Sequence, residues 1–266
     1  MTLRLAHLSD IHFGGEHRDA VGAAAGWIAE HRPDLAIITG DVTREGSETE
    51  FVAARRWIRS LAVDSLVVPG NHDTPYFSLM KRLFAPWKRY ERHFGPVSPS
   101  LLRRPGLAIA SINTARGVQL RTNWSKGAIS AGQVKGAVRA LAEAPAGSLK
   151  IVACHHPLIE MIGGPMSGQV HGGHDAAVAL ADGGVDLVLT GHVHAPFALP
   201  YPGGDGHTWA VGASTLSVRE RGSPIGFNCI EVDEDIVRIS ALAWSGSHFE
   251  TWRTWSIDRR PKPARP

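Results

Sequence analysis

The feature that most constrains the fold of this chain is a polar cluster of Asp, His or Asn that recurs directly after an apolar run. The five clusters lie at residues 10–12, 40–41, 70–73, 155–157 and 191–194. Each follows a predicted buried strand, and these strands are Leu3–Leu8, Leu35–Thr39, Ser65–Val68, Leu149–Ala153 and Leu187–Thr190. If the five strands share one sheet, the clusters meet at its carboxyl edge, where open α/β proteins bind ligands.

Helical patterns separate the predicted strands in the first two thirds of the chain. Apolar residues recur at helical spacing within 20–28, 51–61 and 134–141, and Ser130 with Gln133 has the spacing of a capping box. Residues 207–258 instead indicate short strands, at 208–212, 227–232, 236–243 and 248–257. We expect an α/β fold in which these later strands form a second, more antiparallel sheet. The result would be a four-layer α-β-β-α sandwich of two mixed sheets with helices outside.

Length and composition exclude several other classes of protein. A chain of 266 residues fits one domain, which we place at 1–258, followed by a basic tail at 259–266 that we expect to be disordered. Two cysteines exclude a disulfide framework and a Cys-rich zinc site. The sequence has no 18-residue apolar span, and a strand that begins near residue 3 leaves no room for a signal peptide. We therefore expect a cytoplasmic protein that does not enter a membrane.

The residue types in the clusters predict a metal site. The seven candidate ligands are Asp10, His12, Asp41, Asn71, His155, His192 and His194. Side chains two apart on a strand share a face, so Asp10 and His12 could share one ion. Nitrogen and oxygen ligands without Cys suit Mn, Fe or Zn. Seven ligands are too many for one ion and predict two, bridged by a carboxylate.

Charge predicts the reaction class. Two divalent ions carry more positive charge than Asp10 and Asp41 neutralise, and a bridging hydroxide leaves about one positive charge. That excess suits an anionic phosphate ester, and paired ions catalyse hydrolysis of such esters.

The five clusters together resemble the motifs of the calcineurin-like metallophosphoesterases, in order, spacing and strand context. The short chain is most similar to bacterial class III cyclic-nucleotide phosphodiesterase-like members. The resemblance implies that Asp10, His12, Asp41 and His194 hold one metal and that Asp41, Asn71, His155 and His192 hold the other. It also implies that Asn71 and His72 bind the substrate, and that His72 is catalytic and is oriented by the second catalytic residue, Asp73.

The predicted function is a two-metal phosphodiesterase that acts on small diesters, a cyclic nucleotide or a related compound, through a metal-bridging hydroxide. The alternatives are a phosphomonoesterase and a metal-dependent nuclease, and a scaffold without turnover is disfavoured because no motif residue is missing. A nucleic acid partner is possible but not favoured. Oligomeric state stays open.

Several residues near the motifs have ordinary explanations. We expect His156 to support its neighbour rather than bind metal, and Cys154 to be a buried, inert thiol rather than a nucleophile. Segments 74–104 and 158–174 should lie over the site, because each follows a motif directly. The first is rich in basic and aromatic residues. It could bind a nucleotide or nucleic acid, but we favour an amphipathic helix with its aromatic residues in the core.

Overall fold

A computed structural model describes residues 3–97, 100–119, 123–160, 170–201 and 205–261 of the chain. The helices are α1 (Arg18–His31), α2 (Glu48–Ser60), α3 (Leu79–Phe84), α4 (Lys88–Phe94), α5 (Ala131–Ala142) and α6 (Gly173–Asp182). The strands of the first half are β1 (Leu3–Leu8), β2 (Leu35–Thr39), β3 (Ser65–Val68), β4 (Leu101–Arg104) and β5 (Leu107–Ser111). Those of the second half are β6 (Leu149–Ala153), β7 (Leu187–Thr190), β8 (Phe197–Pro200), β9 (Trp209–Gly212), β10 (Gly226–Val232), β11 (Ile236–Trp244) and β12 (Phe249–Asp258).

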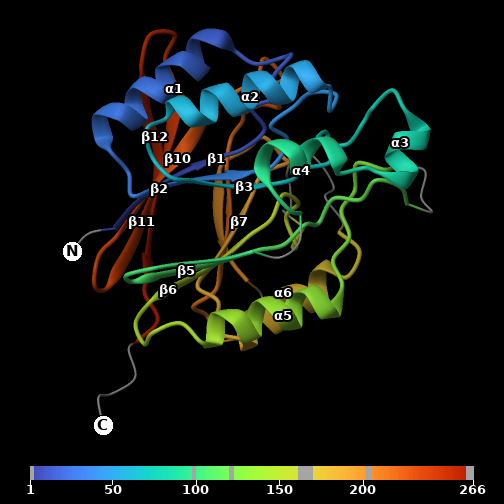
Figure 1. The fold of residues 1–266 in the computed structure, drawn as a ribbon. Coiled ribbons are helices and arrows are strands. Elements are labelled where there is room, and N and C mark those ends of the chain that lie inside the picture. Colours follow the sequence, from blue (N-terminus) through green and yellow to red (C-terminus); the bar gives the residue numbers. More distant parts are fainter. Residues whose placement is uncertain (1–2, 98–99, 120–122, 161–169, 202–204, 262–266) are drawn as a thin grey trace.

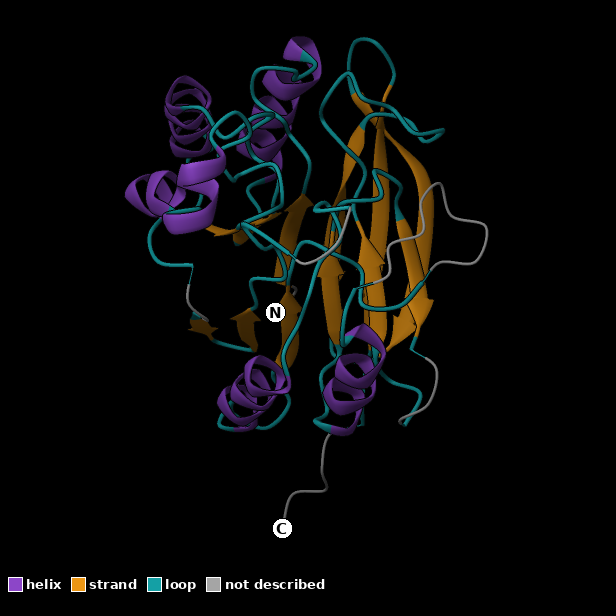
Figure 2. Cartoon of the chain, turned by 90° about the vertical axis from the view of Figure 1, so that its right-hand side faces the viewer, coloured by secondary structure: helices purple, strands orange, loops and turns teal. Residues whose placement is uncertain are grey.

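The helices and strands stack in four layers (Figures 1 and 2). One sheet has the order β12-β11-β10-β1-β2-β3 and the other has the order β4-β5-β6-β7-β9-β8. Helices α1 and α2 cover the outer face of the first sheet, and α5 and α6 cover the outer face of the second (Figure 1). The predicted α-β-β-α sandwich of two mixed sheets is confirmed.

The membership of the two sheets differs from the prediction. The later strands β10 to β12 do not form the second sheet, because β10 pairs antiparallel with β1 and extends the first sheet. Only β8 and β9 join the second sheet, where β9 runs parallel to β7. An uncovered edge of β1 would expose unpaired backbone groups. The local sequence indicates that β10 is a strand, but it does not indicate that β10 pairs with the edge of β1.

Apolar side chains alternate between two sets of neighbours along the central strands. In β2, Ala36 and Ile38 pack toward the helices, whereas Leu35 and Ile37 pack between the sheets. In β6, Val152 packs toward α5 and α6 while its neighbours pack between the sheets. Burial on both faces explains why these strands are continuous apolar runs in the sequence.

Segment 74–97 contains two helices with different environments. Helix α4 buries Tyr90 and packs Trp87 and Phe94 against the core beside α2, as an amphipathic helix should. The stretch that holds α3 leaves its large apolar side chains in solvent: Tyr76, Phe77, Leu79, Met80, Leu83 and Phe84 are 50–80% exposed. The expectation that the aromatic residues of this segment lie in the core is therefore right for α4 and wrong around α3.

The beginning of the predicted disordered tail is held in place. The Arg259 guanidinium donates to the carbonyl groups of Gly147 and Asp233, and Arg260 pairs with Asp186 and Asp205. These contacts join the start of the tail to carboxylates and backbone carbonyls that lie far away in the sequence, and no local pattern indicated them. Residues 262–266 lie outside the described part of the chain. Among the described helices, none has the length and apolar character needed to cross a membrane.

Candidate metal centre

The candidate ligands project from the carboxyl ends of strands in both sheets. Asp10, His12, Asp41 and Asn71 follow β1, β2 and β3 of the first sheet, whereas His155, His192 and His194 follow β6 and β7 of the second. The expectation that all five strands share one sheet is thus wrong. The seven residues nevertheless come together, because the packed sheets bring their carboxyl edges to the same place. All seven are at most 7% exposed.

Five of the seven ligand candidates have a left-handed backbone. The φ angles of Asp10, His12, Asp41, His192 and His194 lie between 50° and 68°. Side chains other than Gly seldom adopt this conformation, and where they do the strain is commonly found at functional sites. The pairing of Asp10 with His12 therefore does not come from strand alternation, as the sequence suggested, but from a loop beyond the end of β1.

Close packing of the chain explains why two motif positions are occupied by glycine. A Cβ atom on Gly70 would overlap the carboxylate and backbone nitrogen of Asp41, and one on Gly191 would overlap Ser9 and the Asp10 carboxylate. Gly70 thus permits two loops of the first sheet to touch, and Gly191 permits a loop of the second sheet to touch a loop of the first. At this contact the His192 backbone N–H donates to Asp10 Oδ2 at 2.8 Å.

Asp10, His12 and His194 form the first ligand cluster. His194 Nε2 lies 3.1 Å from Asp10 Oδ1, and His12 Nε2 lies 3.7 Å from the same oxygen and 3.4 Å from His194 Nε2. The Nδ1 atoms point away and donate to carbonyl groups, His194 to Arg219 and His12 to Thr43. These bonds fix the tautomer that leaves each Nε2 as an acceptor, the state in which imidazole binds metals.

Asp41 and His155 form the second cluster, with Asp10 as its third member. His155 Nε2 lies 3.2 Å from Asp41 Oδ2, and its Nδ1 donates to the Thr39 carbonyl at 2.7 Å. Asp41 Oδ2 also lies 3.9 Å from His12 Nε2, so this one carboxylate faces both clusters.

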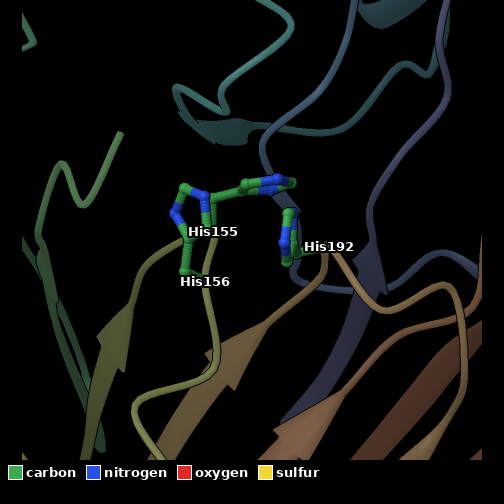
Figure 3. A group of neighbouring side chains, drawn as sticks. All are labelled: His155, His156 and His192. Atoms are coloured by element: carbon green, nitrogen blue, oxygen red, sulfur yellow. The ribbon is translucent and has the colours of Figure 1, made fainter. Parts of the chain in front are cut away.

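His192 approaches the second cluster from the other strand end. Figure 3 shows its ring beside those of His155 and His156, and the ring centroids of His155 and His192 are 5.2 Å apart. The ligand atoms of the three histidines lie within 4.8 Å of one another. His156 is nevertheless a poor ligand, since Nδ1 bonds to Thr114 Oγ1 and Nε2 to the Ser125 carbonyl. Both ring nitrogens thus have protein partners, as expected for a residue that supports its neighbour rather than binds metal.

Three buried side-chain atoms test whether this centre suits metal ions. Asp10 Oδ1, Asn71 Oδ1 and His155 Nε2 are candidate ligand atoms that are shielded from solvent and make no hydrogen bond within the described residues. Within the same part of the chain, Asp10 Oδ1 and His155 Nε2 have only the ion-pair contacts already described, with histidines and with Asp41 respectively. Buried polar atoms without partners are rare, and each calls for an explanation such as an ion. The set of carboxylate, amide and imidazole donors, with no thiolate, fits Mn, Fe or Zn. The residues therefore fit the expected metals.

Electrostatics favours the charge states that bind metals at Asp10, Asp41 and His12, but not at His155. Burial alone would raise the pKa of Asp10 and Asp41, but neighbouring histidines, His194 and His155 respectively, outweigh it and hold both pKa values below the ordinary range. Burial lowers the pKa of His12 to about 4, so its ring is neutral. Burial acts the same way on His155, but Asp41 outweighs it and raises the pKa to about 9. A metal must displace the proton of His155.

His72 lies beside the centre and is not a member of either cluster. Its ring meets that of His12 edge-on at 4.8 Å, and its Nδ1 donates to the Arg44 carbonyl at 2.6 Å. Within the described residues, Nε2 has no partner and is therefore available to a ligand.

Asp73 does not orient the imidazole of His72, contrary to the expectation. Its buried carboxylate accepts hydrogen bonds from the backbone N–H groups of Gly70 and Thr43 and from the Thr43 hydroxyl. Asp73 thus ties the loop after β3 to the loop after β2. Its adjacency to His72 in the sequence gave no indication of these backbone partners.

A cavity of about 890 Å³ opens onto the centre and is lined by His12, Asn71 and His72. The remaining wall includes Arg44, Tyr76, Arg82, Trp124 and Arg219. Tyr76 and Arg82 belong to segment 74–104, so its predicted place at the site is confirmed. Arg44, Trp124 and Arg219 were missed because no motif marks them. Most of 158–174 lies outside the described residues, and His171 and His174 are exposed.

Cys154 lies close to the centre but has no nucleophilic character. It is fully buried, its Sγ approaches the His156 carbonyl, and burial raises the pKa of the thiol to about 12. The prediction of an inert thiol is confirmed.

Two solved structures share the fold of the whole chain. A purple acid phosphatase from yellow lupin superposes with a TM-score of 0.71 at 12% identity, over 97% of this chain and 54% of the lupin enzyme. A dimetal phosphatase from Danio rerio superposes with a TM-score of 0.70 at 11% identity, over 97% of this chain and 99% of that protein. At such identities the likeness concerns the fold alone.

Sequence comparison gives a closer relationship. A probable cyclic nucleotide phosphodiesterase of Synechococcus is 26% identical over 260 residues, which cover 92% of this chain and 93% of the relative. A glycerophosphodiester phosphodiesterase of Enterobacter lignolyticus is 31% identical over 80 residues, 26% of this chain and 29% of that enzyme. The family model for calcineurin-like phosphoesterases matches residues 3–196, which contain all five motifs. The chain therefore belongs to the calcineurin-like phosphoesterase family.

Proposed function

We propose that this protein is a two-metal phosphodiesterase that hydrolyses small diesters. One metal would bind Asp10, His12, Asp41 and His194, and the other would bind Asp41, Asn71, His155 and His192. The main support is the set of buried candidate ligand atoms that make no hydrogen bond within the described residues, Asp10 Oδ1, Asn71 Oδ1 and His155 Nε2. The position of Asp41, with Oδ2 near both His155 and His12, supports its role as the shared ligand.

The metal pair would supply an activated water and would neutralise charge on the phosphoryl oxygens. The chain's own residues supply position and a proton. Because Nδ1 of His72 donates to the Arg44 carbonyl, a proton on the imidazolium is free to leave only from Nε2. We assign this proton to the departing alkoxide oxygen, and Asn71, on the same cavity wall, to contact with the substrate. Asp73 supports both by holding their loop.

Two comparisons favour diesters over other phosphate esters, and the cavity volume favours a small substrate. The relative that matches along nearly its full length is named as a probable cyclic nucleotide phosphodiesterase. A glycerophosphodiester phosphodiesterase also matches over a shorter stretch. The cavity has the volume of a site for a nucleotide-sized ligand. A cytoplasmic location and the choice among Mn, Fe and Zn stay predictions from the sequence.

The decisive experiment compares bis(p-nitrophenyl) phosphate with p-nitrophenyl phosphate and a single-stranded oligonucleotide. Protein stripped by a chelator would be reloaded separately with Mn, Fe or Zn and assayed beside His72→Ala. We expect the diester to be hydrolysed best, activity to depend on reloading, and kcat to fall by about 10²-fold in the variant. The variant His174→Ala, which removes an exposed histidine from α6, serves as the matched control.

Each other outcome identifies a different function. Preference for the monoester would make the protein a phosphomonoesterase, and efficient cleavage of the oligonucleotide with steep salt dependence would make it a nuclease. If the metal-loaded protein and His72→Ala were equally inactive on all three compounds, the enzymatic proposal would be wrong.

A further inference from the structure

Arg82 is a buried cation on the wall of the cavity. The residue is only 9% exposed although it lies on α3, whose apolar residues are in solvent. Its Nε donates to the Gly117 carbonyl at 2.6 Å, and its guanidinium lies 5.2 Å from the ring centroid of Trp124. The hydrogen bond uses one of the five N–H donors of the guanidinium. Nη1 and Nη2 donate no hydrogen bond to any described residue.

The charge of Arg82 has no carboxylate partner. Every Asp and Glu side chain of the sequence falls within the described ranges, and none lies within 4.0 Å of this guanidinium. Burial lowers the pKa of Arg82, but a guanidinium stays protonated in proteins. A buried charge without a partner is costly, so proteins normally pair it. Arg44, in the same cavity, shows the ordinary arrangement: it is exposed and lies 3.7 Å from a carboxylate oxygen of Glu45.

The unpaired guanidinium shares its cavity with the metal centre. Arg82, Trp124 and Tyr76 line the same space as His12, Asn71 and His72. A ligand that reaches the centre can therefore extend to Arg82 without leaving the cavity. A guanidinium matches the geometry of a phosphate through paired N–H donors, and Nη1 and Nη2 are the donors left free.

We propose that Arg82, which lies over the ring of Trp124, binds a second phosphoryl group of the substrate, separate from the diester at the metal centre. This inference rests on the proposed phosphodiesterase function and narrows its substrate class. A diester with one further phosphate would be a better substrate than a diester that carries a single negative charge, such as a cyclic mononucleotide. Trp124 would hold the guanidinium plane in position, since a cation–π contact restricts its orientation.

The test uses two substrates that differ by one phosphate. Thymidine 5′-(p-nitrophenyl phosphate) has a single diester charge, and the same compound with a 3′-phosphate adds the second phosphoryl group. We expect the metal-loaded wild-type protein to prefer the 3′-phosphorylated compound by about tenfold or more in kcat/KM, mainly through a lower KM. A charge-assisted hydrogen bond from Arg82 to the added phosphate is strong enough to produce a difference of this size. In Arg82→Gln this preference should fall to near one.

Lys81→Gln is the matched control for the variant. It removes the same charge from the adjacent position of α3, but Lys81 is exposed and does not line the cavity. The preference should persist in this control, which separates a local contact from a general loss of positive charge. Thermal unfolding of both variants would show whether the contact of Arg82 with Gly117 is needed for folding. If Arg82→Gln fails to fold, Trp124→Leu should still reduce the preference.

The outcomes separate the two proposals. Hydrolysis of both compounds at equal kcat/KM by the wild-type protein would overturn the role of Arg82 and leave the phosphodiesterase proposal intact. A preference that survives in Arg82→Gln would also overturn it. Inactivity of the metal-loaded protein on both compounds and on bis(p-nitrophenyl) phosphate would instead count against the proposed function itself.

Discussion

The cavity is bordered by two regions that are built in opposite ways. The ligand loops are almost fully buried, five of their residues have a left-handed backbone, and side chains from both sheets fix them. The stretch around α3 exposes its apolar residues and is anchored beside the cavity by Arg82. The buried, strained loops hold their side chains in fixed positions, as one specific chemistry requires. The exposed stretch around α3 can change in sequence without disturbing those side chains. Under the proposed function, we expect the reaction to depend on the first region and substrate choice on the second.

Asp41→Ala should have the largest effect, because it removes the carboxylate that faces both ligand clusters. We expect kcat/KM for the diester to fall on the order of 10³-fold and bound metal to fall below two ions per chain. Elemental analysis beside the assay measures both, with the exposed Asp182→Ala as control. Full metal content with normal activity would contradict the expectation that the reaction depends on the buried ligand loops.

Gly191→Ala should destabilise the ligand loops by overpacking. The added Cβ would overlap Ser9 and the Asp10 carboxylate at the contact between the sheets, and we expect a loss of about 2 kcal/mol in the free energy of unfolding. Urea denaturation measures the change. Gly136→Ala on α5 is the control, since its Cβ meets nothing within 4 Å, and it should stabilise the protein by up to about 1 kcal/mol. Equal effects would show that the loops tolerate overpacking.

His7 should make the region beneath the ligand loops sensitive to acid. Burial lowers the pKa of this histidine from 6.5 to about 3, so below pH 6.5 the unfolded chain binds a proton that the folded chain does not. Its contribution to stability is complete above pH 6.5 and is lost as the pH falls toward 3. The loss amounts to about 1.4 kcal/mol per pH unit. Denaturation of His7→Gln between pH 7 and 4 should show a smaller slope, and an unchanged slope would contradict the assignment.

Phe77→Ser, in the stretch around α3, should have the smallest effect. Phe77 is 80% exposed, so we expect a change within about 0.5 kcal/mol in the free energy of unfolding. Phe51→Ala in the core of α2 should cost about 3–5 kcal/mol in the same experiment. A loss above about 1 kcal/mol for Phe77→Ser would mean that this stretch is as tightly packed as the ligand loops.

Local patterns predicted the elements and the ligand set better than their arrangement. The apolar spacing and the Ser130 capping box located α5, and runs such as Leu35–Thr39 located strands, because these signals lie within a few residues. The antiparallel pairing of β10 with β1 joins residues more than 200 positions apart, and nothing local specifies it. The partners of Asp73 and the meeting of Arg82 with Trp124 were unpredictable for the same reason. The left-handed Asp and His residues were missed because only Gly adopts that conformation readily.

The origin of the ligands in both sheets has a mechanical consequence. Asp10, Asp41 and Asn71 extend from one sheet, and His155, His192 and His194 from the other, so a loaded centre would fasten the two sheets together at one edge. The rest of their interface is mainly apolar, with a hydrogen bond from Asn228 Nδ2 to the Gly212 carbonyl, and apolar contacts resist sliding less than directional bonds do. The metal pair would thus fix the position of one sheet relative to the other. Substitutions deep between the sheets could then alter turnover without touching the cavity.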